Sequence, residues 1–253
     1  MKKFLWLTGP AVWFILLAAL LITWAVMDPN TAIPFFDNNG TSPFELATLP
    51  IFALIAAAVW VFNPFEGSKC RQRILQVLVT MVALLAIAKE LDLHLVALHY
   101  LYPDFVTDTG VMAPGLFKPN GAPLGGTPYK MRVLTNGGVP LGMKFFIVTY
   151  FVAFFGAFAG GFIYLLPTWV KGVFKLDPCA WAFGTFGASG VVVQISDRLP
   201  AWLGHGYGLV KAEDGGVTMM QSLVTILEEG GEMMLAVAGV VTVVLGWATK
   251  QHD

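Results

Sequence analysis

Charged residues are scarce in this sequence. Lys, Arg, Asp and Glu together make up 12% of its 253 residues, while hydrophobic residues make up 57%. A soluble domain of this size rarely shows such a balance, whereas a protein with several membrane-spanning segments requires it. The composition therefore predicts a multi-pass integral membrane protein.

Motifs of several enzyme and binding classes are also absent. The sequence has no Walker loop, dinucleotide-binding fingerprint, cysteine-rich zinc motif or Gly-x-Ser-x-Gly nucleophile elbow. Its two cysteines are too few for a thiolate metal site. No basic stripe indicates nucleic acid, so we expect no nucleic-acid partner. Any chemistry must therefore come from isolated polar residues near the apolar segments.

Long apolar runs dominate what is present. Six runs reach the length of about 20 residues that a helix needs to cross about 30 Å of hydrocarbon. They cover about 7–27, 44–63, 74–98, 144–166, 179–197 and 218–248. Segments inside a bilayer must satisfy their own backbone hydrogen bonds, and these runs are too long for barrel strands. The sequence predicts an all-α fold, a single six-helix transmembrane domain over residues 1–253 whose largest outer loop is 99–143.

Basic residues predict the orientation of this domain. With the N-terminus inside, the cytoplasmic segments contain Lys2, Lys3, Lys69, Arg71, Arg73, Lys171, Lys175 and Lys250. The loops on the other side are poor in Lys and Arg, and the first of them, 28–43, has neither. The positive-inside rule therefore predicts that both termini are cytoplasmic. We expect the protein in the inner (plasma) membrane of a bacterium.

The few acidic residues gather at one depth. A helix rises about 1.5 Å per residue, so depth can be counted from the inner end of each span. Glu90 on the third span, Asp197 on the fifth and Glu232 on the sixth lie about 24 to 28 Å from those ends, near the outer edge of the hydrocarbon. Three helices are therefore expected to bring carboxylates to one layer.

Helical spacing adds side chains to this layer. Glu228 and Glu232 are four residues apart, as are Glu90 and His94, so each pair is expected to share a helix face. Glu229 lies on the flank of the first pair, three residues before Glu232. Two residues one turn apart can bind a common ion.

Acids outnumber bases in this layer. Lys89 and Arg198 face six acids, which are Glu90, Asp92, Asp197, Glu228, Glu229 and Glu232. Like charges in a poor dielectric share protons or recruit a cation. The sequence predicts a divalent metal held by Glu90, His94, Asp197, Glu228 and Glu232. Carboxylates with imidazole favour Zn, Mn or Fe, and Ca or Mg fit if the histidine is not a ligand.

Two functional hypotheses follow from this layer. In the first, the protein is a metal-dependent hydrolase whose metal-bound water attacks a membrane lipid or lipid-linked substrate, with Glu229, Asp92 and His99 as acid–base groups. In the second, the acids form an ion or proton site in a transporter or in a subunit of a larger membrane complex. The inner halves of the third and sixth spans offer only Gln76, Thr80 and Thr242 as polar groups, which favours a site open to one side.

Three features also have purely structural explanations. The glutamates at the start of 218–248 would simply precede the membrane if this helix, about 46 Å long, extends beyond it. The fragment 42-SPFE-45 predicts a capping box, which explains Glu45 without a role in the acidic layer. The pair Gly230–Gly231 lowers helix propensity and predicts close helix packing, a local kink or a break.

Overall fold

Six long helices form the body of the protein. The computed structural model describes residues 2–37, 42–91, 93–107, 110–111, 131–203 and 218–250. The long helices are α1 (Thr8–Val26), α3 (Pro43–Val61), α4 (Lys69–Glu90), α7 (Leu141–Phe174), α8 (Pro178–Leu203) and α9 (Met219–Lys250). Each contains a segment long and apolar enough to cross a membrane. The predicted all-α fold with six such helices is confirmed, as expected for a multi-pass membrane protein.

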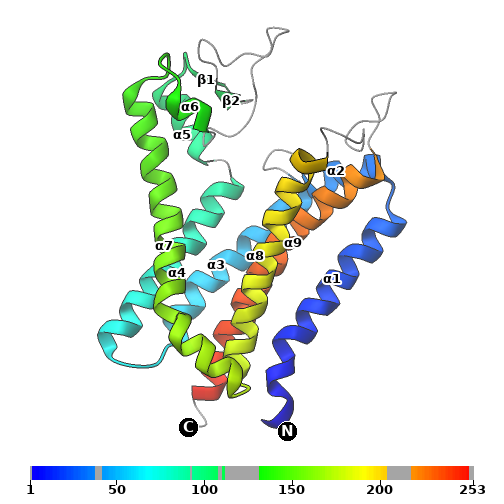
Figure 1. Ribbon diagram of the computed structural model, residues 1–253, viewed down its shortest axis with the longest axis vertical. Helices are drawn as coiled ribbons and strands as arrows, with labels where there is room; N and C mark the ends of the chain where they lie inside the picture. The colour runs from blue at the N-terminus through cyan, green and yellow to red at the C-terminus, as the bar shows by residue number, and fades with distance from the viewer. Residues whose placement is uncertain are drawn as a thin grey trace.

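Short elements gather at one end of this bundle. They are α2 (Pro29–Phe36), α5 (Leu93–Leu101), α6 (Met131–Thr135) and the antiparallel strands β1 (Val106–Thr107) and β2 (Gly110–Val111). The 3₁₀ helix η1 (Lys2–Leu7) precedes α1 at the other end, where α9 also finishes (Figure 1). We call the end that contains α2, α5 and α6 the distal end.

The third span is shorter than the sequence predicts. α4 ends at Glu90 and the separate helix α5 begins at Leu93, in place of one helix over 74–98. Leu91 leaves the helical conformation (φ −87°, ψ 7°), and its N–H closes α4 by donating to the carbonyl oxygens of Ile87 and Lys89. The shared helix face predicted for Glu90 and His94 is therefore wrong, because the two residues belong to different helices.

α9 is the helix on which α1, α2, α3 and α8 pack. A Cβ added at Gly230 would lie 2.5 Å from Leu20 Cδ1 of α1, and one added at Gly231 would lie 2.8 Å from Val193 Cγ2 of α8. The glycine pair therefore lets two helices approach α9 from different sides. Since α9 is continuous through both glycines, close packing explains the pair and a helix break does not.

The start of α3 forms the capping box that its sequence predicts. The Glu45 backbone N–H donates to Ser42 Oγ at 3.0 Å, and the Ser42 backbone N–H donates to Glu45 Oε2 at 2.8 Å. Pro43 follows at the first helical position, where a backbone N–H would have no partner within the helix, so proline loses no hydrogen bond there. The box fixes the Glu45 carboxylate at the distal end of the bundle.

Apolar side chains cover much of the outside of the bundle. On α7 they include the exposed Phe145, Phe151 and Phe155. A surface of this kind is unfavourable in water and favourable against lipid chains. The exposed face of α7 is thus suited to the hydrocarbon of a bilayer.

Candidate functional site

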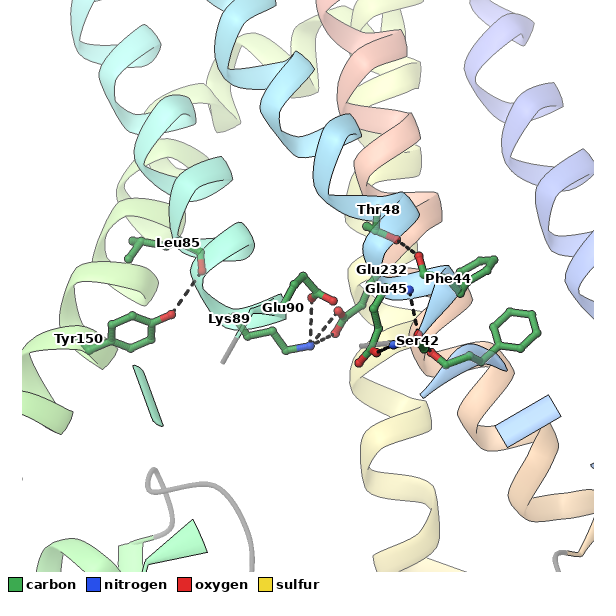
Figure 2. Close-up of polar contacts among 10 residues, drawn as sticks. Ser42, Phe44, Glu45, Thr48, Leu85, Lys89, Glu90, Tyr150 and Glu232 are labelled. Atoms are coloured by element: carbon green, nitrogen blue, oxygen red, sulfur yellow. Dashed lines mark hydrogen bonds and ion pairs between the residues drawn. The ribbon is translucent and has the colours of Figure 1, made fainter. Parts of the chain in front are cut away.

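Lys89 links α4 to α9 at the distal end. It lies in the last turn of α4, and its side chain extends towards Glu232 on α9 (Figure 2). Its Nζ donates to Glu232 Oε1 at 2.7 Å and Oε2 at 2.8 Å, and to Glu90 Oε1 at 3.2 Å. The ammonium group thus lies between carboxylates from two different helices.

A third carboxylate completes the group. One oxygen from each of Glu90, Glu229 and Glu232 lies within 4.8 Å of the others. Glu229 and Glu232 are three residues apart on α9 and share a face, while Glu90 is the last residue of α4. Glu90 is buried and the other two are half-buried. We call Lys89, Glu90, Glu229 and Glu232 the Lys89 cluster.

Glu229 also belongs to a second acidic group. Its carboxylate and those of Asp37 and Glu45 have oxygens within 4.8 Å of one another. Asp37 is exposed at the C-cap of α2, and Glu45 is buried in the capping box. Because the two groups share Glu229, a row of carboxylates leads from exposed Asp37 to buried Glu90. Glu45 therefore borders this row in addition to capping α3.

The charges of the Lys89 cluster balance only if carboxyl groups are protonated or a cation is added. With all three carboxylates ionised, the one ammonium group would leave a net charge of 1 − 3 = −2. Partial burial removes the water that would otherwise stabilise these charges. Carboxylates this close together share protons or hold a further cation. The geometry is therefore suited to binding positive charge.

His94 lies on α5 and packs beside Tyr150 of α7. Its side chain is buried, and the His94 ring centroid is 5.6 Å from that of Tyr150 on α7. Burial, with a smaller contribution from the Lys89 charge, lowers the pKa of His94 to about 4. The imidazole is therefore neutral at pH 7, the form that can ligate a metal. Within the described residues, however, neither acidic group includes His94, so its predicted role as a ligand stays a prediction.

His99 lies in the last turn of α5 and belongs to neither acidic group. Its Nδ1 is 2.5 Å from the carbonyl oxygen of Val106, which links α5 to β1. This contact gives His99 a structural role at the distal end. A catalytic role for His99 stays a prediction that the geometry does not favour.

The other predicted site residues are only partly described. Glu228 lies on α9 but is in neither acidic group, so Glu229 takes the place beside Glu232 that was expected for Glu228. Asp197 belongs to α8, and its side chain is outside the described part of the structure. Asp92 lies outside the described residues altogether. Their proposed roles stay predictions.

Sequence reasoning did not predict two features of this arrangement. Lys89 was counted among the bases of the acidic layer, but its pairing with a carboxylate 143 positions away was not predicted. Asp37 was not considered, because it follows the first span in a short polar segment without a motif. A lysine in the last turn of a membrane helix, next to an acid, was the available signal for Lys89.

Polar side chains in the half of the bundle away from the distal end form hydrogen bonds within one helix or between two helices. Gln76 Nε2 donates to the Val59 carbonyl oxygen at 2.8 Å, and Trp60 Nε1 donates to Thr80 Oγ1 at 2.8 Å. Thr242 Oγ1 donates to the carbonyl oxygen of Ala238 in its own helix at 2.7 Å. These groups serve helix packing, which favours a site open at the distal end.

Comparisons with known proteins do not assign a family. No protein-family model matches the chain, and no curated protein and no solved structure matches it. The function must therefore be argued from the Lys89 cluster and its surroundings.

Proposed function

We propose that the Lys89 cluster binds and releases protons or a monovalent cation, and that the protein is an ion- or proton-handling membrane protein. The observation that carries this proposal is a single ammonium group among three carboxylates whose oxygens lie within 4.8 Å of one another. Since the cluster lacks positive charge, it takes up protons or a cation from its surroundings.

The contacts suggest a division of roles within the cluster. Both oxygens of Glu232 accept from Lys89, so this pair fixes α4 against α9 and anchors the site. Glu229 belongs to both acidic groups and so connects the cluster to Asp37 at the surface. We assign exchange with the surroundings to Glu229, with Glu90 as the buried end of the row.

The row of carboxylates supports exchange from the distal end. With both termini in the cytoplasm, as the basic residues predict, this end would be the outer face of the membrane. A proton or cation would enter at Asp37 and pass Glu45 before reaching Glu229. Transport across the whole membrane would require a second opening towards the other end.

Infrared difference spectroscopy tests the proposal directly. Acidification of the purified protein from about pH 8 to about pH 6, a range in which ordinary exposed carboxylates stay ionised, should produce the carbonyl stretching band of protonated carboxyl groups. Glu90→Gln and Glu229→Gln should each reduce this band, whereas the control Glu66→Gln should leave it unchanged, since exposed Glu66 is in neither acidic group. The proposal fails if both cluster variants give the wild-type band. Addition of Na⁺ or K⁺ at constant pH shows whether a cation replaces the proton, because replacement would weaken the band.

A metal-dependent hydrolase acting on a lipid or lipid-linked substrate is the second candidate. It is favoured by the spacing of the three carboxylate oxygens, which suits a hard divalent cation. Lys89 opposes it, because an ammonium group and a divalent cation in one cluster repel each other. Elemental analysis of wild type, Glu90→Gln and Glu232→Gln decides: stoichiometric metal lost in both variants supports this candidate, and a metal-free wild type excludes it.

A further inference from the structure

Basic side chains gather at the end of the bundle opposite the Lys89 cluster. They lie at the start of α4 and the end of α7 and are Lys69, Arg71, Arg73, Lys171 and Lys175. We call these five residues the α4–α7 basic surface.

Arg71 joins the two helices of this surface. Its Nη2 donates to Thr168 Oγ1 of α7 at 2.8 Å, and its Cζ lies 5.4 Å from the centroid of the Tyr164 ring on the same helix. Lys171 follows Thr168 by three residues and therefore lies on the same face of α7. Lys171 is thus on the face of α7 that Arg71 contacts and adds a positive charge to it.

Basic residues outnumber acids here, since the five bases of the surface are accompanied by only Glu66 and Asp177 in the segments that join α3 to α4 and α7 to α8. The first turn of α4 contains Lys69 and Arg71 but no acidic residue, although the positive end of a helix dipole favours acids. The ion pairs found among the described residues are both made by Lys89, so none of the five basic residues forms one. Asp177, an acid at this end, accepts a hydrogen bond from the backbone N–H of Cys179 instead. An anion from outside the chain would remove this imbalance.

Aromatic rings contact two of these cations, an arrangement typical of the level of lipid headgroups. Arg73 lies over Trp60, with its Cζ 5.3 Å from the ring centroid, as Arg71 lies over Tyr164. Trp and Tyr prefer the boundary between hydrocarbon and headgroups, and cations stacked on their faces are held there. Lys171 and Lys175 are exposed and can reach the same level with their flexible side chains.

We propose that the α4–α7 basic surface binds the phosphate group of an anionic phospholipid headgroup. Arg71, fixed by Thr168 and Tyr164, provides a preorganised donor, and Lys171 and Lys175 add charge at the rim. A phosphodiester at the membrane surface supplies the missing negative charge without leaving the bilayer. Free inorganic phosphate has the same chemistry and is the other source to test.

Native mass spectrometry of the detergent-purified protein tests this proposal. Wild type should retain phosphatidylglycerol more strongly than phosphatidylcholine. In Lys171→Gln/Lys175→Gln the affinity for phosphatidylglycerol should fall, by about fivefold for each removed charge. Both replaced side chains are exposed, so the double variant should fold. Lys144→Gln, on the same helix but in its first turn, is the matched control and should bind as wild type does.

Three results would overturn the proposal. The first is equal retention of the two lipids by wild type, and the second is unchanged phosphatidylglycerol binding in the double variant. The third is displacement of the lipid by an equal concentration of inorganic phosphate, which would assign the surface to a soluble anion. All three can be obtained whether or not the Lys89 cluster binds protons.

Discussion

At the scale of single residues, Lys89 determines the character of the site. It acts as a cation that is covalently attached to the protein and bound by carboxylates from two helices. A buried or half-buried carboxylate is unfavourable without such a partner. The Lys89 ammonium therefore holds the cluster together, but this one positive charge cannot compensate three ionised carboxylates.

Replacing Lys89 by Gln should destabilise the protein. Removal of one partner from a buried ion pair costs about 3–5 kcal/mol, but the Lys89 side chain is 46% exposed, so we expect about 2 kcal/mol. The free energy of unfolding in mixed detergent–SDS micelles measures this change. Adding Glu232→Gln should recover part of the loss, because it removes the carboxylate left without its ammonium. Equal stability of Lys89→Gln and wild type would contradict the role given to this ion pair.

His94 should make stability depend on pH. Its pKa of about 4 in the folded protein lies below its ordinary value of 6.5, because burial disfavours the charged ring. The unfolded chain therefore binds the proton first as the pH falls. Stability should be complete above about pH 6.5 and decrease towards pH 4, by about 2 kcal/mol at pH 5.

Unfolding measured between pH 7 and pH 5 checks this prediction. His94→Phe should remove the part of the pH dependence that comes from this ring. Val96→Ala, on the same helix but exposed, is the control and should keep the wild-type profile. If His94→Phe loses as much stability on acidification as wild type does, the pH dependence arises elsewhere.

At the scale of helices, the features predicted correctly are local in sequence. Six apolar runs predict six helices because hydropathy reports burial in lipid, and Ser42 with Glu45 predicts a cap from a spacing of three. The break after Glu90 is invisible to hydropathy, since the apolar run continues through Leu91 and Leu93. The presence of Glu229, in place of Glu228, beside Glu232 depends on how α9 is rotated against α4, which a single helix pattern does not contain.

Gly230→Ala should destabilise the protein by about 1–3 kcal/mol, since the new methyl group would meet Leu20 Cδ1 at 2.5 Å and push α1 away from α9. The matched control is Gly156→Ala on α7, where no atom lies within 4 Å of the added Cβ. Alanine is the better helix former, so the control should be neutral or more stable by up to about 1 kcal/mol. Equal free energies of unfolding for the two variants would contradict close packing at Gly230.

At the scale of the whole molecule, charge is separated along the bundle. The Lys89 cluster and the row from Asp37 lie at the distal end, and the α4–α7 basic surface lies at the end where α9 finishes. The apolar segments of the six long helices keep the two apart. This separation suits a protein that crosses a bilayer with its acidic site at the outer face and its basic surface at the cytoplasmic face.

Accessibility of cysteines to a membrane-impermeant thiol reagent tests the orientation on which these assignments depend. Native Cys70, exposed at the start of α4, should react in inside-out vesicles and not in intact cells or right-side-out vesicles. In a Cys70→Ser background, Gly137→Cys should show the opposite behaviour, because Gly137 is exposed in the turn before α7 at the distal end and a Cβ there meets nothing within 4 Å. The reverse labelling pattern would put the Lys89 cluster on the cytoplasmic side, so that protons or cations would reach it from inside the cell and the basic surface would face the outer leaflet.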